Sequence, residues 1–156
     1  MHLVYSDSGL LEKDSTPSIF LAGPSPRGYG DGHPKDWRDD AIKFFKELGF
    51  RGKVFIPRPS SGHMGNYYNQ IEWELHHLEI SNVILFWVPR KYPEMKGMTT
   101  NVEFGMWIKD PKVIYGRPDW AEQTRYLDHI YKKYLNRNPH SDLRTLVKCS
   151  KMMVGI

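Results

Sequence analysis

The chain of 156 residues has a single cysteine, Cys149, so it cannot form an intrachain disulfide bond. No apolar run approaches the roughly 20 residues that a transmembrane helix requires. The first residues do not combine a basic stretch with an apolar core, as a secretory signal does. We therefore expect a cytoplasmic protein that does not enter a membrane, and a lone cysteine fits that reducing compartment.

The sequence also lacks a concentrated charge of either sign. It has 22 Lys and Arg against 18 Asp and Glu, a net charge of +4, and the basic residues are spread among acids. This distribution disfavours nucleic acid as a partner. An anionic small molecule fits the same weak positive charge and needs far less surface.

Common cofactor and metal motifs are missing. The loop "GPSPRG" has no lysine and lacks the glycine spacing of a P-loop or a dinucleotide fingerprint, and no G-x-S-x-G elbow occurs. His76 and His77 are adjacent on a predicted helix, so they point to different faces, and the other histidines are isolated. We expect no metal and no cofactor.

Short apolar segments alternate with amphipathic ones along the chain. We interpret 18–22, 53–57, 83–88 and 112–116 as strands, and 36–50, 67–82, 99–110, 119–135 and 141–153 as helices. This alternation predicts a three-layer α/β fold, a doubly wound parallel sheet of four to five strands flanked by helices. The length favours one domain over residues 1–156, with residues 1–16 as an extended arm.

Loops rich in glycine and proline follow three of the predicted strands, at Gly23–Arg27, Pro57–His63 and Pro89–Thr100. The carboxyl ends of parallel strands meet at one edge of a sheet, where such folds bind ligands. The loops should therefore surround one crevice. Arg27 could bind a phosphate there, although a rigid proline-rich turn explains the first loop equally well.

Glu103, in the segment "TTNVEFG", has two interpretations. The pattern T-x-x-E is a capping box, with Thr100 as N-cap and Glu103 at the third helical position. Alternatively, the helix begins at the crevice and Glu103 points into it, where the positive end of the helix dipole would keep the carboxylate ionised, as a nucleophile must be. The local pattern alone favours the cap, and the two roles are compatible.

Glu74 shares a predicted helix face with Ile71, Leu75 and Leu78. A carboxylate on a buried stripe is costly unless it is paired or used, whereas at the edge of the stripe it could reach water. Two carboxylates at one crevice would permit acid–base and nucleophilic chemistry, as in glycoside cleavage.

The remaining candidates are polar or aromatic. Gln70 could hydrogen-bond the edge of a base, or it could simply be solvated on its helix. Trp87 ends the most apolar strand and is interpreted first as a core residue, although its ring could stack on a base. Tyr67, Tyr68 and Asn69 are further possible ligand contacts, and Cys149 fits a core thiol of the last helix.

Several segments together resemble the nucleoside 2-deoxyribosyltransferase family, in particular its bacterial and phage branch of nucleoside 2-deoxyribosyltransferase-like proteins. They are "IFLAGPSPR", "WRDDAIKFF", "VFIPRP", "YNQIEWELHHLEISNVILFWVPR", "MTTNVEFGMW" and "VIYGRPDWAEQTRYLD". They occur in the family order and span Ile19 to Asp128. The part "ILFWVPR…TTNVEFG" is the most specific.

The resemblance implies a flavodoxin-like fold, a homo-oligomer and cleavage or transfer at the N-glycosidic bond of a (deoxy)nucleoside or nucleoside 5′-monophosphate. It places the nucleophile, which forms a glycosyl ester, at Glu103 and an assisting acid at Glu74. It implies that Gly23, Ser25 and Arg27 line the sugar or phosphate pocket, and "SPRG", Ser25 to Gly28, is similar to a motif that contacts the 5′-phosphate in related nucleotide N-hydrolases. Gln70, Trp87 and Asn101 are further candidate residues for substrate binding.

The sequence departs from the family at two acidic positions. The usual "AD" pair before the third strand is Ser81-Asn82, and the loop before the nucleophile helix offers only Glu94. These departures leave the general acid open. They also keep a second hypothesis, a non-catalytic nucleotide-binding or sensor module on the same fold.

Overall fold

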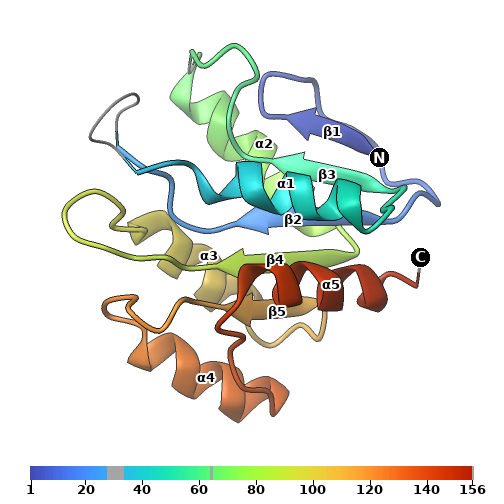
Figure 1. The fold of residues 1–156 in the computed structure, drawn as a ribbon. Helices are drawn as coiled ribbons and strands as arrows, with labels where there is room; N and C mark the ends of the chain where they lie inside the picture. Colours follow the sequence, from blue (N-terminus) through green and yellow to red (C-terminus); the bar gives the residue numbers. More distant parts are fainter. Residues whose placement is uncertain (28–33, 64, 156) are drawn as a thin grey trace.

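The computed structural model describes residues 1–27, 34–63 and 65–155. Within these ranges the chain forms a fully parallel sheet and five α-helices (Figure 1). The strands are β1 (His2–Tyr5), β2 (Ser18–Ala22), β3 (Lys53–Ile56), β4 (Val83–Trp87) and β5 (Val113–Gly116). The helices are α1 (Trp37–Glu47), α2 (Tyr67–Ile80), α3 (Met98–Trp107), α4 (Arg125–Leu135) and α5 (Leu143–Met153). None of these helices is long and apolar enough to cross a membrane.

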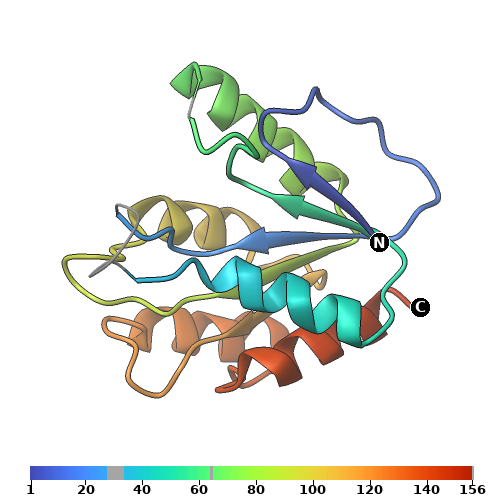
Figure 2. The same cartoon turned by 45° about the horizontal axis from the view of Figure 1, so that its top comes forward.

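Each face of the sheet is covered by helices, because successive residues of a strand point to opposite faces. In β4, Leu85 and Trp87 pack with α1 and α5, whereas Ile84 and Phe86 pack with α2, α3 and α4. Figure 2 shows the three layers from a second side. Both faces of β4 are buried, which is why its sequence is continuously apolar.

The strand order is β1-β3-β2-β4-β5. The chain leaves β2 toward β3 on one side and returns to build β4 and β5 on the other. The direction of winding therefore reverses between β2 and β4, and a crevice opens beyond their carboxyl ends. This is an open three-layer α/β fold consistent with the flavodoxin-like class, as the alternation of segments predicts.

The prediction of an extended arm over residues 1–16 is wrong for its first residues. His2 to Tyr5 form the edge strand β1, paired with β3 in the register His2↔Lys53 to Tyr5↔Ile56. Further on, the backbone oxygen of Leu11 lies 2.6 Å from His76 Nε2, and the amide of Leu11 donates to His77 Nε2 at 3.4 Å. These long-range contacts hold the segment against α2.

Two helices begin at residues other than the predicted ones. α3 begins at Met98, after Gly97 in the left-handed region (φ +66°), and no side chain caps it. The prediction of Thr100 as an N-cap is therefore wrong. α4 begins at Arg125 and not at residue 119, because the preceding residues turn through a bond from the Ala121 amide to the Pro118 oxygen at 3.1 Å.

The buried face of α2 also differs from the predicted stripe. Trp73 and His77 are buried, with their rings stacked at 4.1 Å, whereas Leu75 is 38% exposed. The larger aromatic surfaces take the place against the sheet, since they bury more apolar area than a leucine. Glu74 therefore lies at the edge of the buried face and borders the crevice.

Candidate active site

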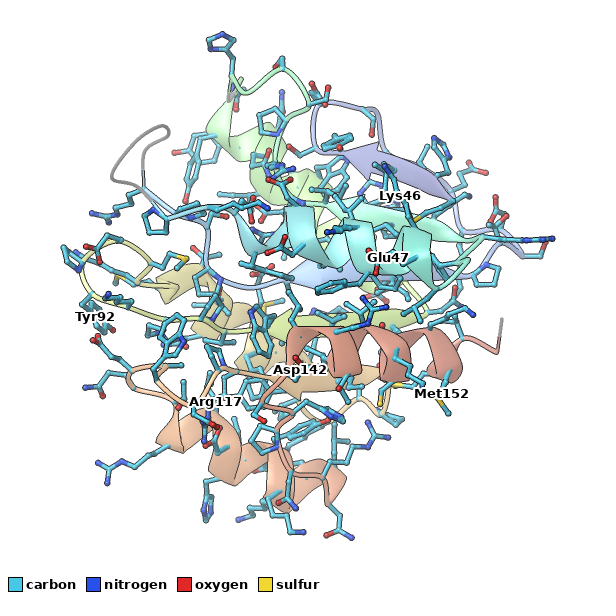
Figure 3. All side chains as sticks on the ribbon, in the orientation of Figure 1. Lys46, Glu47, Tyr92, Arg117, Asp142 and Met152 are labelled. Atoms are coloured by element: carbon cyan, nitrogen blue, oxygen red, sulfur yellow. The ribbon has the colours of Figure 1, made fainter. Side chains whose placement is uncertain are left out.

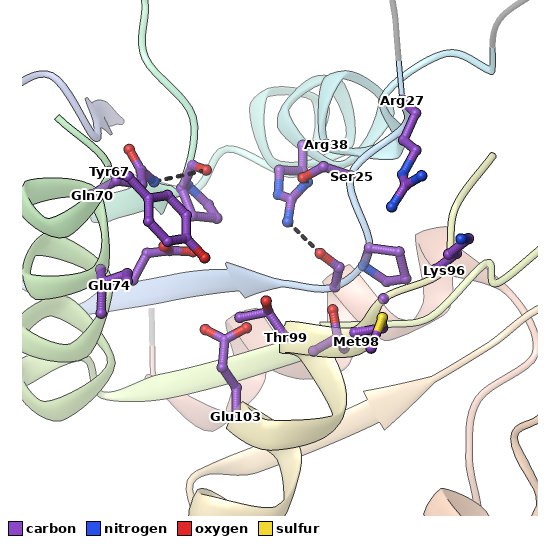
Figure 4. A pocket seen from close by; sticks show the side chains of 16 residues that line it. Ser25, Arg27, Arg38, Tyr67, Gln70, Glu74, Lys96, Met98, Thr99 and Glu103 are labelled. Atoms are coloured by element: carbon purple, nitrogen blue, oxygen red, sulfur yellow. Dashed lines mark hydrogen bonds between the residues drawn. The ribbon is translucent and has the colours of Figure 1, made fainter. Parts of the chain in front are cut away.

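A cavity of about 400 Å³ lies beyond the carboxyl ends of β2 and β4 (Figure 4). Its wall consists of the loop after β2, Pro57 after β3, one side of the first two turns of α2, and the residues from Lys96 into α3. These are the loops and helix starts that strand polarity predicts to meet. Volume and position suit a small ligand at a topological switch point.

The cavity brings together most of the predicted site residues. Those that line it are Gly23, Ser25, Arg27, Gln70, Glu74 and Glu103. Tyr67 also lines it, whereas Tyr68 and Asn69 do not. Gly28, the last residue of the predicted "SPRG" motif, lies outside the described residues.

Trp87 and Asn101 do not line this cavity. Trp87 packs in the core under α1 and α5, as its first interpretation predicts, and the alternative role of stacking on a base in this cavity does not fit its position. Asn101 is exposed on α3, where its side-chain oxygen accepts a hydrogen bond from Arg90. The alternation along β4 places Trp87 on the α1 side.

Gly23 allows β2 and β4 to approach closely where the cavity begins. Its φ is +152°, and a Cβ atom there would lie 2.0 Å from the backbone oxygen of Trp87. Any side chain at this position would push the loop after β2 away from β4. Ser25 and Arg27 depend on this close approach for their place at the cavity.

Glu103 lies in the second turn of α3 and is 8% exposed. Burial raises the pKa of its carboxyl to about 8, and the negative charge of Glu74 adds to the rise. Since α3 begins at Met98, Glu103 is neither the predicted capping residue nor close enough to the helix end to be held ionised by it. Burial and the charge of Glu74 therefore oppose ionisation of Glu103, and the start of α3 does not offset them.

Glu74 faces the same space from α2, as Figure 4 shows. Burial raises the pKa of its carboxyl to about 7, while Arg38 and the side chain of Gln70 oppose the rise. Within the described residues, neither Glu74 nor Glu103 forms a salt bridge. Because the charge of Glu74 acts on Glu103, the two carboxyls titrate as a coupled pair.

Arg38 is a cavity residue that the sequence analysis missed. It is 1% exposed, and its guanidinium binds the loop after β2. A signal was present: Arg38 occupies the buried face of α1 with Ala41, Ile42 and Phe45, at the spacing i, i+3, i+4, i+7. A charge on a buried stripe is costly unless it is paired or used, and this holds for Arg38 as it does for Glu74.

The mouth of the cavity is electropositive. Arg27 and Lys96 border it, and the backbone amide of Arg27 donates to the oxygen of Glu94 at 3.0 Å, which ties two loops together. The first turn of α3 also borders it, and that turn has no side-chain cap. Free amides at a helix start attract anions.

The departures from the family pattern have structural explanations. Ser81 Oγ donates to the Leu78 oxygen at 3.0 Å, and Asn82 Oδ1 accepts from the amide of Ser18 at 2.8 Å. Both lie where β4 begins, at the opposite edge of the sheet from the cavity. Glu94 does not line the cavity either.

In residues 1–27, 34–63 and 65–155, no group of three His, Cys, Asp or Glu side chains is arranged to hold a metal ion.

A family model described as "nucleoside 2-deoxyribosyltransferase like" matches residues 16–121. The chain belongs to this family. The matched residues include β2 to β5 and all the residues named above as lining the cavity. Family membership indicates deoxyribosyltransferase-like glycosyl transfer with a nucleoside substrate. No curated protein sequence matches the chain.

Proposed function

We propose that this protein cleaves, or transfers a sugar from, the N-glycosidic bond of a (deoxy)nucleoside 5′-monophosphate or nucleoside, through a covalent ester on Glu103. The observation that carries the proposal is a pair of acids at the cavity, the buried Glu103 and the half-buried Glu74. Glu74 and Glu103 enter one cavity from two helices and have no ion-pair partner among the described residues. Buried carboxyls with strongly perturbed pKa values in a cleft mark functional sites.

The reaction is a double displacement. A carboxylate oxygen of Glu103 attacks C1′ of the sugar, the bond from C1′ to the base nitrogen breaks, and its electron pair leaves with the base. The transition state resembles an oxocarbenium ion. The glycosyl ester is then attacked at C1′ by water, which gives hydrolysis, or by a second base, which gives transfer, and Glu103 is released as a carboxylate.

Glu74 is proposed to assist at the sugar or the departing base. A carboxyl with a pKa of about 7 holds a proton in part of the molecules at neutral pH and can donate it. Reaction requires the form of the pair in which Glu103 is ionised and one proton remains on Glu74. This form belongs to the singly protonated state of the pair, which is populated most between the two macroscopic pKa values.

The mouth of the cavity favours a 5′-monophosphate over a free nucleoside. Arg27, Lys96 and the uncapped start of α3 present positive charge and N–H donors on one side, away from Glu74 (Figure 4). A phosphate would bind there through charge-assisted hydrogen bonds. The sugar would then lie between the phosphate and the two acids.

A non-catalytic nucleotide-binding module is the second candidate. The observation that favours it is the position of Glu94, which does not line the cavity, so the loop before α3 supplies no acid to the described site. Such a module would be stabilised thermally by nucleotides and would leave them intact.

Chromatography of reaction mixtures separates the two candidates. We would incubate the protein with ribo- and deoxyribonucleosides and their 5′-monophosphates, with and without an added free base. Free base indicates hydrolysis and a new nucleoside indicates transfer, and either must disappear in Glu103→Gln but persist in Glu72→Gln, which alters an exposed acid of α2 that does not line this cavity. Folded protein without turnover across the panel would favour the binding module.

The resemblance also implies a homo-oligomer in the cytoplasm, and we propose both on that ground. Light scattering coupled to gel filtration measures the mass directly, and a mass of about one chain, 18.3 kDa, would contradict the oligomer. Fractionation of the source cells tests the compartment.

A further inference from the structure

Arg38 binds the end of β2 and the loop after it at three points. Its Nε donates to the Leu21 oxygen at 3.1 Å, its Nη2 to the Gly23 oxygen at 2.7 Å, and its Nη1 to Ser25 Oγ at 3.1 Å. A guanidinium holds such a fork in one plane, which an ammonium does not. The path of the loop that forms one wall of the cavity therefore depends on this side chain.

Arg38 shares its acidic partner with a second arginine. Its acidic partner is Asp36, whose Oδ1 lies 3.3 Å from Arg38 Nη1. Asp36 also accepts from Arg58 at 2.5 Å and caps α1 through the amide of Arg38 at 3.1 Å. One carboxylate thus serves two arginines, and Arg58 takes Asp39 at 2.5 Å as a second partner. The two arginines and two aspartates balance in number, and of the four side chains Arg38 is the one that lines the cavity.

The charge of Arg38 faces the cavity acids. Glu74 approaches from α2 and Glu103 from α3, while Arg38 extends from α1 beneath the loop after β2 (Figure 4). The other cations at the cavity, Arg27 and Lys96, lie at its mouth. Arg38 lowers the pKa of both acids and so opposes the effect of burial.

We propose that Arg38 is a positioning residue of the glycosyl chemistry, which fixes the loop after β2 and supplies the buried positive charge against which Glu74 and Glu103 ionise. The inference rests on the proposed function only for its consequence in catalysis. The coupling of charges is a property of the ligand-free protein.

The contact with Ser25 gives a second consequence. The hydroxyl oxygen of Ser25 accepts a hydrogen bond from Arg38, so its own proton is free to point elsewhere. Ser25 lines the cavity, and the hydroxyl therefore acts as a donor toward an oxygen of the ligand. Arg38 sets this direction without contacting the ligand.

The test is a titration of the two acids in ligand-free protein labelled with ¹³C at the glutamate side-chain carboxyl, with Glu74→Gln and Glu103→Gln to assign the signals. Arg38→Met removes the charge, and we expect both pKa values to rise by about one unit, since an opposite charge nearby shifts a carboxyl by about 1–3 units. Arg38→Lys keeps the charge and is expected to shift them by less than half as much. Arg144→Met changes an exposed arginine of α5 and is the matched control, so the pKa values of Glu74 and Glu103 should not change in it.

Asp36→Asn tests the effect of the Arg38 charge through a shift of the two pKa values in the opposite direction. Asparagine still caps α1, so the helix start is preserved. Removing the negative charge leaves Arg38 less neutralised, and both acids should titrate at lower pH than in the wild type. If Arg38→Met fails to fold, Asp36→Asn alone tests the inference. If both variants fold, pKa shifts in opposite directions cannot come from a general loosening of the loop.

Unchanged titration of Glu74 and Glu103 in Asp36→Asn and in folded Arg38→Met would overturn the inference. Where the panel of substrates gives turnover, Arg38→Met should also move the acid limb of the kcat/KM profile to higher pH. If the pKa values of Glu74 and Glu103 shift in the variants but the wild-type protein turns over no substrate, the charge coupling is upheld and the proposed function is refuted. Failure of the inference and failure of the proposed function are therefore distinguishable.

Discussion

Two helices of this protein each bring an acid to the sheet, and their surroundings are opposite. Asp128 on α4 accepts from Arg117 Nη2 at 2.8 Å, from Arg117 Nε at 3.1 Å and from the hydroxyl of Tyr115 at 2.7 Å. Figure 3 shows Arg117 beside α4. Glu103 on α3 is more deeply buried and has no salt bridge within the described residues. Beyond burial, the charge of another acid, Glu74, raises the pKa of Glu103, and the charge of Arg38 lowers it.

The difference separates a structural acid from a reactive one. An acid that is fully bonded contributes to folding, and its removal leaves Arg117 and Tyr115 without their shared partner. An acid that is buried beside a like charge costs folding free energy and persists only where it is used. Opposite effects of mutation on stability and on turnover should therefore distinguish Asp128 from Glu103.

The largest effect is expected for Glu103→Gln. Turnover should fall at least about 10³-fold, because the amide is a poor nucleophile. Stability should rise, since a folded pKa of about 8 against the ordinary 4.5 means that the folded state binds more protons between these values and loses stability as pH rises through them. Thermal unfolding should show a gain that grows from about pH 5 to pH 8 and reaches about 4 kcal/mol.

A loss of stability in Glu103→Gln, equal at all these pH values, would instead support a structural role such as a cap. The exposed acid Glu72 is the control, and Glu72→Gln should alter neither turnover nor the pH dependence of unfolding.

Glu74→Gln should lower kcat/KM by about 100-fold, which is typical for loss of an assisting acid. It should also change the pH profile. Without the negative charge of Glu74, the pKa of Glu103 falls, so the acid limb moves to lower pH and the alkaline limb disappears. Initial rates between about pH 5 and pH 9 measure both effects, and a lower rate with unmoved limbs would show that the two acids are not coupled.

Asp128→Asn should act in the opposite way to Glu103→Gln. We expect a loss of about 2 kcal/mol, because Arg117 loses its charged partner while Tyr115 retains an acceptor. Urea unfolding should show a lower midpoint with an unchanged slope. The folded variant should keep the wild-type kcat, and a fall in kcat without loss of stability would break the distinction between the two acids.

The smallest effect is expected at the mouth of the cavity. Arg27→Gln should raise KM for 5′-monophosphates by about tenfold and leave KM for nucleosides unchanged, since one charge-assisted contact to phosphate is lost. Lys43→Gln, on the exposed side of α1, is the matched control. An equal change for both substrate types would place Arg27 away from the phosphate.

The sequence predicts most of the sheet and the crevice, because they depend on local patterns and on the polarity of parallel strands. The choice of Glu74 and Glu103 depends in addition on the resemblance to the family. The sequence misplaces the start of α3, since T-x-x-E resembles a cap although Gly97 already turns the chain. The ionisation of Glu103 could not be predicted from α3 alone. It depends on burial by distant segments and on Glu74, which only the folded chain brings close.

Other errors have the same origin. The apolar pattern predicts that β4 is buried on both faces but does not say which side chains of β4 approach the cavity, so it leaves both a core role and a ligand contact open for Trp87. β1 is short, and only its pairing with β3 makes it a strand. Arg38 was predictable from its position on a buried stripe, although the loop that it binds was not.

The most direct test of the central claim is the mass of the intact protein after incubation with a 2′-deoxy-2′-fluoroarabinosyl nucleoside 5′-monophosphate. The fluorine destabilises the oxocarbenium-like transition state and slows hydrolysis of the ester. We predict an increase equal to one fluorinated sugar phosphate, located by peptide mapping on Glu103 and absent from Glu103→Gln. Release of base from this substrate without an adduct, or with an adduct on another residue, would contradict the account.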